Sequence, residues 1–190
     1  MNTEMSKNEN LFYRTLLAVA IIAIAAALRV APHPWNFTPV GAMALFSGAI
    51  LKDRRLAFVV PIVALFVGDV FIGLYSYKLM LIVYLSFLVS VVIGFWLRDR
   101  RTIARISAAT LLGAIQFFLV TNFAVWATGL SYQRNVAGLV MCYVAGIPFF
   151  WNTLAGDALY AVLFFGTFAL AERLFPAFRQ PAPAATPAHH

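Results

Sequence analysis

The chain has 190 residues, of which 63% are hydrophobic and only 11% are charged, whereas a soluble domain is roughly 45–50% apolar and about 25% charged. A soluble fold of this length could not bury so much apolar surface, so the composition excludes a soluble domain and predicts an integral membrane protein. The net charge of +7 comes from short basic clusters between apolar runs. This pattern indicates membrane topology rather than nucleic-acid binding.

The apolar runs predict an all-α bundle of about six transmembrane helices, because a helix needs about 20 apolar residues to cross a bilayer. The predicted spans are 12–31, 38–51, 56–76, 79–97, 106–128 and 150–172. The second span is short and follows the helix-breaking string Pro32-His33-Pro34. We expect residues 1–178 to form a single transmembrane domain and 179–190, rich in Pro and Ala, to be a disordered tail.

A further apolar stretch, 136–150, precedes the last span and contains Gly138, Gly146 and Pro148. It is too short to cross a bilayer by itself. We therefore expect a short re-entrant or interfacial segment on the outer side, where protein or water would satisfy its backbone.

The Lys and Arg residues predict the orientation, because basic loops resist translocation. With the N-terminus inside, all of the 14 Lys and Arg residues fall on the cytoplasmic side except Arg29, Lys78 and Arg134. We expect a multi-pass protein of the bacterial inner (plasma) membrane with both termini in the cytoplasm. An alternative for the first span is a cleaved signal peptide, which would leave five spans.

Two carboxylates lie inside predicted spans, Asp69 in the third and Asp157 in the sixth. An ionisable group in hydrocarbon costs roughly 2.5–3.5 kcal/mol on insertion scales, so it is normally paired or faces a water-filled cavity. The rise of about 1.5 Å per residue places both in the outer half of the membrane. The two carboxylates are therefore expected to open onto one cavity reached from outside.

Other polar and aromatic residues fall at a similar depth, whereas the inner halves of the spans carry almost none. This asymmetry predicts an outward-facing substrate-binding site. Its candidate residues are Asn36, Asp69, Tyr75, Asn122, Trp126, Trp151, Asn152, Asp157 and His33. Structural alternatives are an aromatic belt for the Trp and Tyr side chains, helix caps for the asparagines, packing for the aspartates and a plain loop position for the histidine.

Ala20, Ala23 and Ala27 form a stripe of small residues in the first span, a pattern that lets a partner helix approach closely. The single cysteine, Cys142, excludes an internal disulfide and a cysteine-built metal cluster. We interpret it as a small buried side chain. No catalytic residue, metal site or cofactor is predicted.

Several motifs resemble an uncharacterised family of bacterial six-helix membrane proteins. They are the string His33-Pro34-Trp35-Asn36-Phe37-Thr38-Pro39, Gly68-Asp69, Thr121-Asn122, Cys142-Tyr143 and Gly156-Asp157. The family is similar in size and span count to the S components of energy-coupling-factor (ECF) vitamin transporters. That resemblance implies a vitamin or metal-related ligand, an outward-open pocket, and small residues of the first helix meeting a coupling subunit. It also leaves open whether Cys142 or His33 binds a metal-containing ligand.

The leading hypothesis is uptake of a small nutrient, a vitamin or related cofactor precursor, without enzymatic activity. The partners would be the lipid bilayer, the nutrient and an ECF-type coupling subunit with its ATPases. One alternative is a structural or assembly subunit of a membrane complex. Another is an intramembrane aspartyl hydrolase that uses Asp69 and Asp157 as a paired acid and base.

Overall fold

The computed structural model describes residues 2–32, 34–129 and 131–178, and in these ranges every regular element is helical. The elements are α1 (Asn2–Val30), α2 (Val40–Ile50), α3 (Arg54–Ile72), α4 (Tyr77–Phe95), α5 (Ile103–Thr128), α6 (Val136–Leu174) and a short 3₁₀ turn, η1 (Pro176–Phe178). The all-α prediction is confirmed. The predicted disordered tail, 179–190, lies outside the described residues.

Five helices (α1, α3, α4, α5 and α6) are long and apolar enough to cross a membrane. The second predicted span, 38–51, is wrong as a crossing helix, because α2 has only 11 residues and is therefore about 16 Å long. The hydrocarbon core of a bilayer is about 30 Å thick. At least one end of α2 must therefore lie at hydrocarbon depth, where other parts of the protein have to satisfy its backbone groups.

The separate segment predicted over 136–150 is also not an element of its own. Helix α6 runs through it without interruption for 39 residues, with Pro148 inside the helix. A helix of that length extends about 58 Å. Proline and glycine are tolerated in such helices where neighbouring groups replace the lost backbone hydrogen bond. Gly146 and Pro148 therefore do not end the helix before residue 150.

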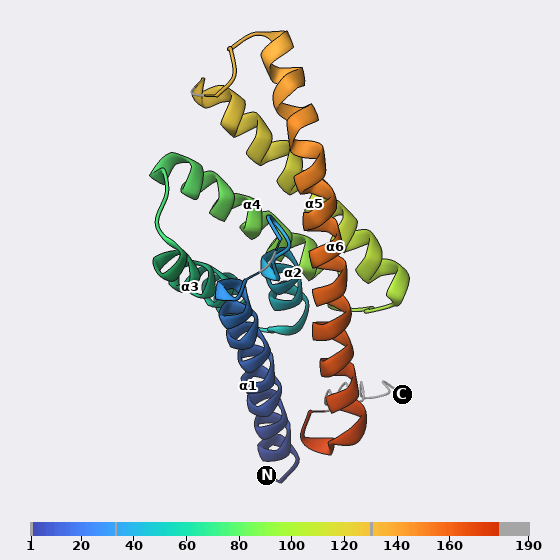
Figure 1. Ribbon diagram of the computed structural model, residues 1–190. Helices are drawn as coiled ribbons and strands as arrows, with labels where there is room; N and C mark the ends of the chain where they lie inside the picture. Colours follow the sequence, from blue (N-terminus) through green and yellow to red (C-terminus); the bar gives the residue numbers. More distant parts are fainter. Residues whose placement is uncertain (1, 33, 130, 179–190) are drawn as a thin grey trace, which may run out of the picture.

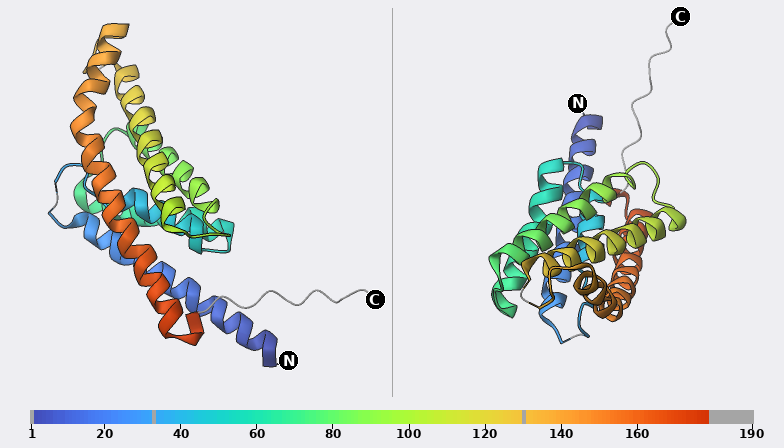
Figure 2. Two further views of the ribbon diagram at one scale, coloured as in Figure 1. Left: turned by 90° about the vertical axis from the view of Figure 1, so that its right-hand side faces the viewer. Right: turned by 90° about the horizontal axis from the view of Figure 1, so that it is seen from above.

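The two ends of the described chain lie at the same end of the bundle. Arg14 of α1 donates a hydrogen bond to Glu172 of α6 at 2.6 Å, and Arg101, which precedes α5, contacts the same carboxylate oxygen at 3.2 Å. Figure 1 shows the start of α1 and the end of α6 side by side, and Figure 2 shows the 31–39 loop and the α5–α6 connection toward the opposite end. The described basic clusters therefore gather at one end, away from those two connections.

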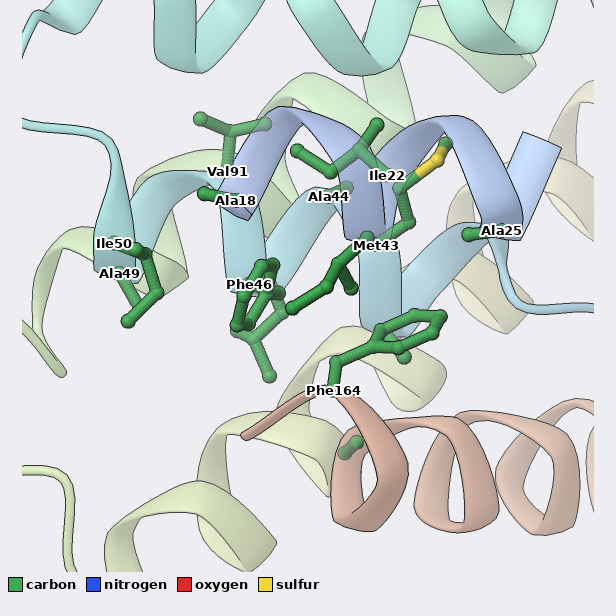
Figure 3. Close-up of a cluster of buried hydrophobic side chains, with 14 of the residues drawn as sticks. Ala18, Ile22, Ala25, Met43, Ala44, Phe46, Ala49, Ile50, Val91 and Phe164 are labelled. Atoms are coloured by element: carbon green, nitrogen blue, oxygen red, sulfur yellow. The ribbon is translucent and has the colours of Figure 1, made fainter. Parts of the chain in front are cut away.

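Helix α2 forms the centre of the bundle. All its residues except Gly41 are buried, and Figure 3 shows its side chains between Ala18, Ile22 and Ala25 of α1 and Phe164 of α6. The ring of Phe46 lies 5.3–5.9 Å from three phenylalanine rings of α6. A helix that is apolar on every side avoids water either in a protein core or in lipid, and α2 lies in the protein core.

The C-terminal end of α2 is satisfied by a side chain from outside the helix. Arg98, which follows α4, donates from Nε to the carbonyl of Gly48 at 2.9 Å and from Nη2 to the carbonyl of Leu51 at 2.7 Å. Burial, together with the neighbouring charge of Arg54, lowers the pKa of Arg98. The guanidinium thus donates hydrogen bonds to carbonyl groups that have no acceptor role within the helix.

Helices α2 and α4 approach each other through two glycines, Gly48 of α2 and Gly94 of α4. A methyl group at Gly94 would meet the carbonyl oxygen of Leu45 and would lie 3.1 Å from the nitrogen of Ala49. These are backbone atoms, which cannot move aside as the end of a flexible side chain can. The close approach therefore depends on the absence of a side chain.

We predict that Gly94→Ala lowers the free energy of unfolding by about 1–3 kcal/mol, because the added methyl group overpacks the α2–α4 contact. Gly166→Ala in α6 is the matched control, since its methyl group would meet no atom within 4 Å. Denaturant titration of both variants in detergent micelles is the measurement. Equal stability of the two variants would contradict the role given to this contact.

Candidate functional site

The N-terminal end of α2 is held by Asp157 of α6. Pro39, at the N-cap position, provides no side-chain hydrogen bond, and the Asp157 carboxylate accepts one from the backbone N–H of Ala42 at 3.0 Å. Asp157 is only 4% exposed. A carboxylate at a helix N-terminus satisfies free N–H groups and interacts favourably with the helix dipole. Asp157 therefore acts as a cap supplied from another helix.

Two glycines make this contact possible. A methyl group at Gly41 would lie 2.5 Å from Oδ1 of Asp157, and one at Gly156 would lie 3.1 Å from the backbone nitrogen of Thr38. Asn152, one turn before Gly156, donates from Nδ2 to the carbonyl of Trp35 at 2.9 Å. The 31–39 loop is thus fixed against α6, directly before the start of α2.

The other intramembrane carboxylate, Asp69 of α3, has separate partners. It forms an ion pair with Arg29 of α1 and accepts a hydrogen bond from the hydroxyl of Tyr84 of α4 at 2.7 Å. The side chains of Asp69 and Arg29 are 2% and 15% exposed. A methyl group at Gly68 would lie 3.0 Å from Cδ of Arg29, so this glycine lets the arginine side chain lie against α3.

Two adjoining cavities lie beside these groups. The first, which we call the polar chamber, has a volume of about 190 Å³, and Arg29, Thr38, Tyr75 and Asp157 contribute to its wall. The second, the aromatic chamber, has a volume of about 170 Å³ and is lined by Phe117, Phe118, Asn122, Gly146, Phe149 and Phe150, among others.

The exposed residue Asn36, together with Phe117 and Thr153, lines both chambers, so we treat them as one recess. Asn36 adopts a left-handed backbone conformation with φ of 60°, which asparagine tolerates better than most residues. Tyr75 lies in the connection after α3, where burial, together with the charge of Asp69, raises its pKa to about 12. Its hydroxyl therefore remains a neutral hydrogen-bond donor at physiological pH.

The structure brings together some of the predicted site residues. Asn36, Tyr75 and Asp157 line the polar chamber, and Asn36 and Asn122 line the aromatic chamber. Asp69 does not line the recess and reaches it only through Arg29. The expectation that both carboxylates open onto one cavity therefore holds directly for Asp157 only.

The remaining candidates lie outside the recess walls. Trp126 donates to the carbonyl of Gln133 at 3.0 Å, Trp151 is 60% exposed, and Asn152 holds the 31–39 loop. His33 lies outside the described residues. Cys142 is buried and contacts the carbonyl of Asn122 through its sulfur at 3.3 Å.

The sequence analysis missed Tyr84 and the phenylalanines of the aromatic chamber. Tyr84 is a phenol in the middle of a largely apolar helix, close to Ser86 and Ser90, and a polar group at that depth is a usable signal. The phenylalanines gave none, because Phe is common throughout this chain and sequence alone does not show which rings face inward.

Of the alanines predicted to dock a partner, Ala23 and Ala27 line an apolar groove of about 580 Å³ between α1 and α3. Ala20 is exposed and does not line it.

We predict that Asp157→Ala lowers the free energy of unfolding by about 1–3 kcal/mol, because buried N–H groups of α2 lose their acceptor. Asp157→Asn keeps a carbonyl oxygen in nearly the same place, so it should retain most of the stability. Unfolding of both variants in detergent is the measurement. Equal losses in the two variants would argue against the capping role.

We predict that Asp69→Asn and Arg29→Met each destabilise the protein by about 3–5 kcal/mol, because either change leaves a buried charge without its partner. Combining the two changes removes both charges, so the double variant should be more stable than either single one. A double-mutant cycle measured by unfolding tests this expectation. Strictly additive losses would show that the ion pair contributes no coupling.

No curated protein and no solved structure matches the chain. A family model described as a family of unknown function (DUF6580) matches residues 9–178, which is most of the chain and includes every described element of the recess. The protein therefore belongs to the DUF6580 family, a family of unknown function.

Proposed function

We propose that this protein is a membrane transporter, or a substrate-binding protein similar to an ECF S component, that takes up a small nutrient from outside the cell. The observation that carries the proposal is the two-chamber recess, which lies next to the start of α2 and is lined by the exposed Asn36. Binding sites are typically concave and mostly apolar, with a few polar groups that fix the ligand. A vitamin or related cofactor precursor fits this description.

The two chambers favour an amphipathic ligand. The polar chamber offers the Tyr75 hydroxyl and the Arg29 guanidinium, while Asp157 is occupied at the start of α2. In the aromatic chamber the rings of Phe118 and Phe150 lie 5.2 Å apart. A flat apolar body would stack among such rings, and a polar end would lie toward Arg29 and Tyr75.

We propose that the recess faces the periplasm and that both termini are cytoplasmic in a bacterial inner membrane. This orientation is supported by the basic residues, because Arg14, Arg98 and Arg101 lie at the end of the bundle opposite the 31–39 loop. Basic residues are retained on the cytoplasmic side. The first part of α6, 136–150, then lies at or beyond the periplasmic surface of the inner membrane.

We propose that energy comes from a partner, in the manner of an ECF-type coupling subunit with its ATPases. The apolar groove lined by Ala23 and Ala27 supports this proposal, because small residues let a partner helix approach closely. The alternative to uptake is a role as a structural or assembly subunit of a membrane complex. In that case the same groove would hold a permanent partner, and the recess would have no ligand.

The aspartyl hydrolase alternative has less support. A catalytic pair requires two carboxylates that interact closely enough to split their pKa values. Asp69 is bound by Arg29 and Tyr84, and Asp157 is bound by the backbone of α2. Each carboxylate thus already has a structural partner, and none of these partners is shared.

We predict that the purified protein binds at least one compound from a panel of vitamins and their heteroaromatic precursors, and that Thr153→Trp weakens this binding at least about tenfold. Thr153 lines both chambers, so the larger side chain would fill the space between them. Leu159→Trp, on an exposed face of the same helix, is the control and should bind normally. Equilibrium dialysis is the measurement.

A panel in which no compound binds would argue against uptake and for the assembly role. Equal affinity of the two tryptophan variants would place the binding site outside the recess.

A further inference from the structure

A second large cavity lies at the opposite end of the bundle from the recess. Helices α5 and α6 contact each other near the α5–α6 connection, where the ring of Phe118 lies 5.5 Å from that of Tyr143. They then diverge toward the other end, as Figures 1 and 2 show. Between them is a cavity of about 720 Å³, bounded by the first half of α5, the residues before it and the last half of α6. We call it the wedge.

The wedge is apolar along its sides and charged at its end. Ile106 of α5 and Val162, Phe165 and Gly166 of α6 form apolar wall, while Arg98 and Arg101 lie at the end with Asp99, Glu172 and Arg173. These side chains belong to α5 and α6, which are long enough to cross a membrane, or to the connection between α4 and α5. The apolar part is therefore at hydrocarbon depth and the charged part at the interface.

The charges at this end favour an anion. Three arginines face two carboxylates, and one of these, Glu172, is also bound by Arg14 of α1, which does not line the wedge. Arg101 contacts Glu172 only through Nη2, and a guanidinium has five N–H donors. Its other donors are thus available to phosphate oxygens, which arginine binds with two parallel hydrogen bonds.

We propose that the wedge binds an anionic phospholipid, with the phosphate at Arg101 and one acyl chain between α5 and α6. An apolar gap within the bilayer is poorly filled by water, because water needs polar partners that these walls do not offer. Gly166 contributes to the shape, since a methyl group added there would meet no atom within 4 Å. Basic pockets between transmembrane helices bind anionic headgroups in this way.

The test compares two lipids on the full-length protein in a neutral detergent. Native mass spectrometry with dioleoyl phosphatidylglycerol and dioleoyl phosphatidylcholine should show retention of the anionic lipid at roughly tenfold lower concentration. Arg101→Gln should remove most of this preference. Arg100→Gln is the matched control, because Arg100 is the preceding residue, is exposed and does not line the wedge. Equal retention of the two lipids, or equal effects of the two substitutions, would overturn the proposal.

A second pair of variants tests the chain-binding part of the wedge. Gly166→Leu should fill the space between the helices and weaken phosphatidylglycerol retention about tenfold. Folding in detergent should be normal, because an added methyl group meets no atom within 4 Å and Gly166 lines the wedge. Leu163→Phe, at an exposed position outside the wedge, should have no effect. Unchanged retention in Gly166→Leu would overturn the proposal. So would an Arg101-dependent stabilisation by glycerol phosphate equal to that by the lipid, since the site would then bind a soluble anion.

Discussion

The structure depends on a helix that is too short for the membrane it lies in. An eleven-residue helix leaves free N–H groups at one end and free carbonyls at the other, and inside a bilayer no water is present to satisfy them. Asp157 satisfies N–H groups at the start of α2, and Arg98 satisfies carbonyls at its end. Both come from other parts of the chain, so the two side chains connect α2 to α6 and to the end of α4 at once.

The short central helix also creates the recess. Because α2 is too short to cross the membrane, the 31–39 loop leads to its start along α6, where Gly156 gives the loop room and Asn152 holds it. The space beside the loop is closed by α5, α6 and the α3–α4 connection and becomes the two chambers. Asp69, Arg29 and Tyr84 tie α1, α3 and α4 together beside it. The intramembrane carboxylates therefore build the walls of the recess more than they present charge to its interior.

The helices and the two buried aspartates could be predicted from the sequence, because both follow from the cost of placing polar groups in hydrocarbon. The prediction was wrong where glycine and proline can either end a helix or lie inside it. Gly146 and Pro148 suggested a break in 136–150, yet α6 continues through them, and Gly146 instead gives room to the side chain of Asn122, whose Oδ1 would lie 2.5 Å from an added methyl group. Two contacts of the aspartates could not be predicted either, that of Asp69 with Arg29 and that of Asp157 with Ala42, because these partners lie 40 and 115 residues away in the chain.

The two Gly-Asp pairs illustrate why a motif of this kind does not name its chemistry. In each pair the glycine allows another part of the chain to come close, Arg29 at Gly68 and the backbone of the 31–39 loop at Gly156. The aspartate then binds what lies there, a guanidinium in one case and a helix N-terminus in the other. A catalytic dyad would require the two carboxylates to act on one another, whereas here each is occupied by its own partners. The two Gly-Asp pairs thus account for helix–helix contact and for the position of the loop. Under the proposed function, contacts to a ligand would fall to Asn36, Tyr75, Asn122 and the aromatic rings around them.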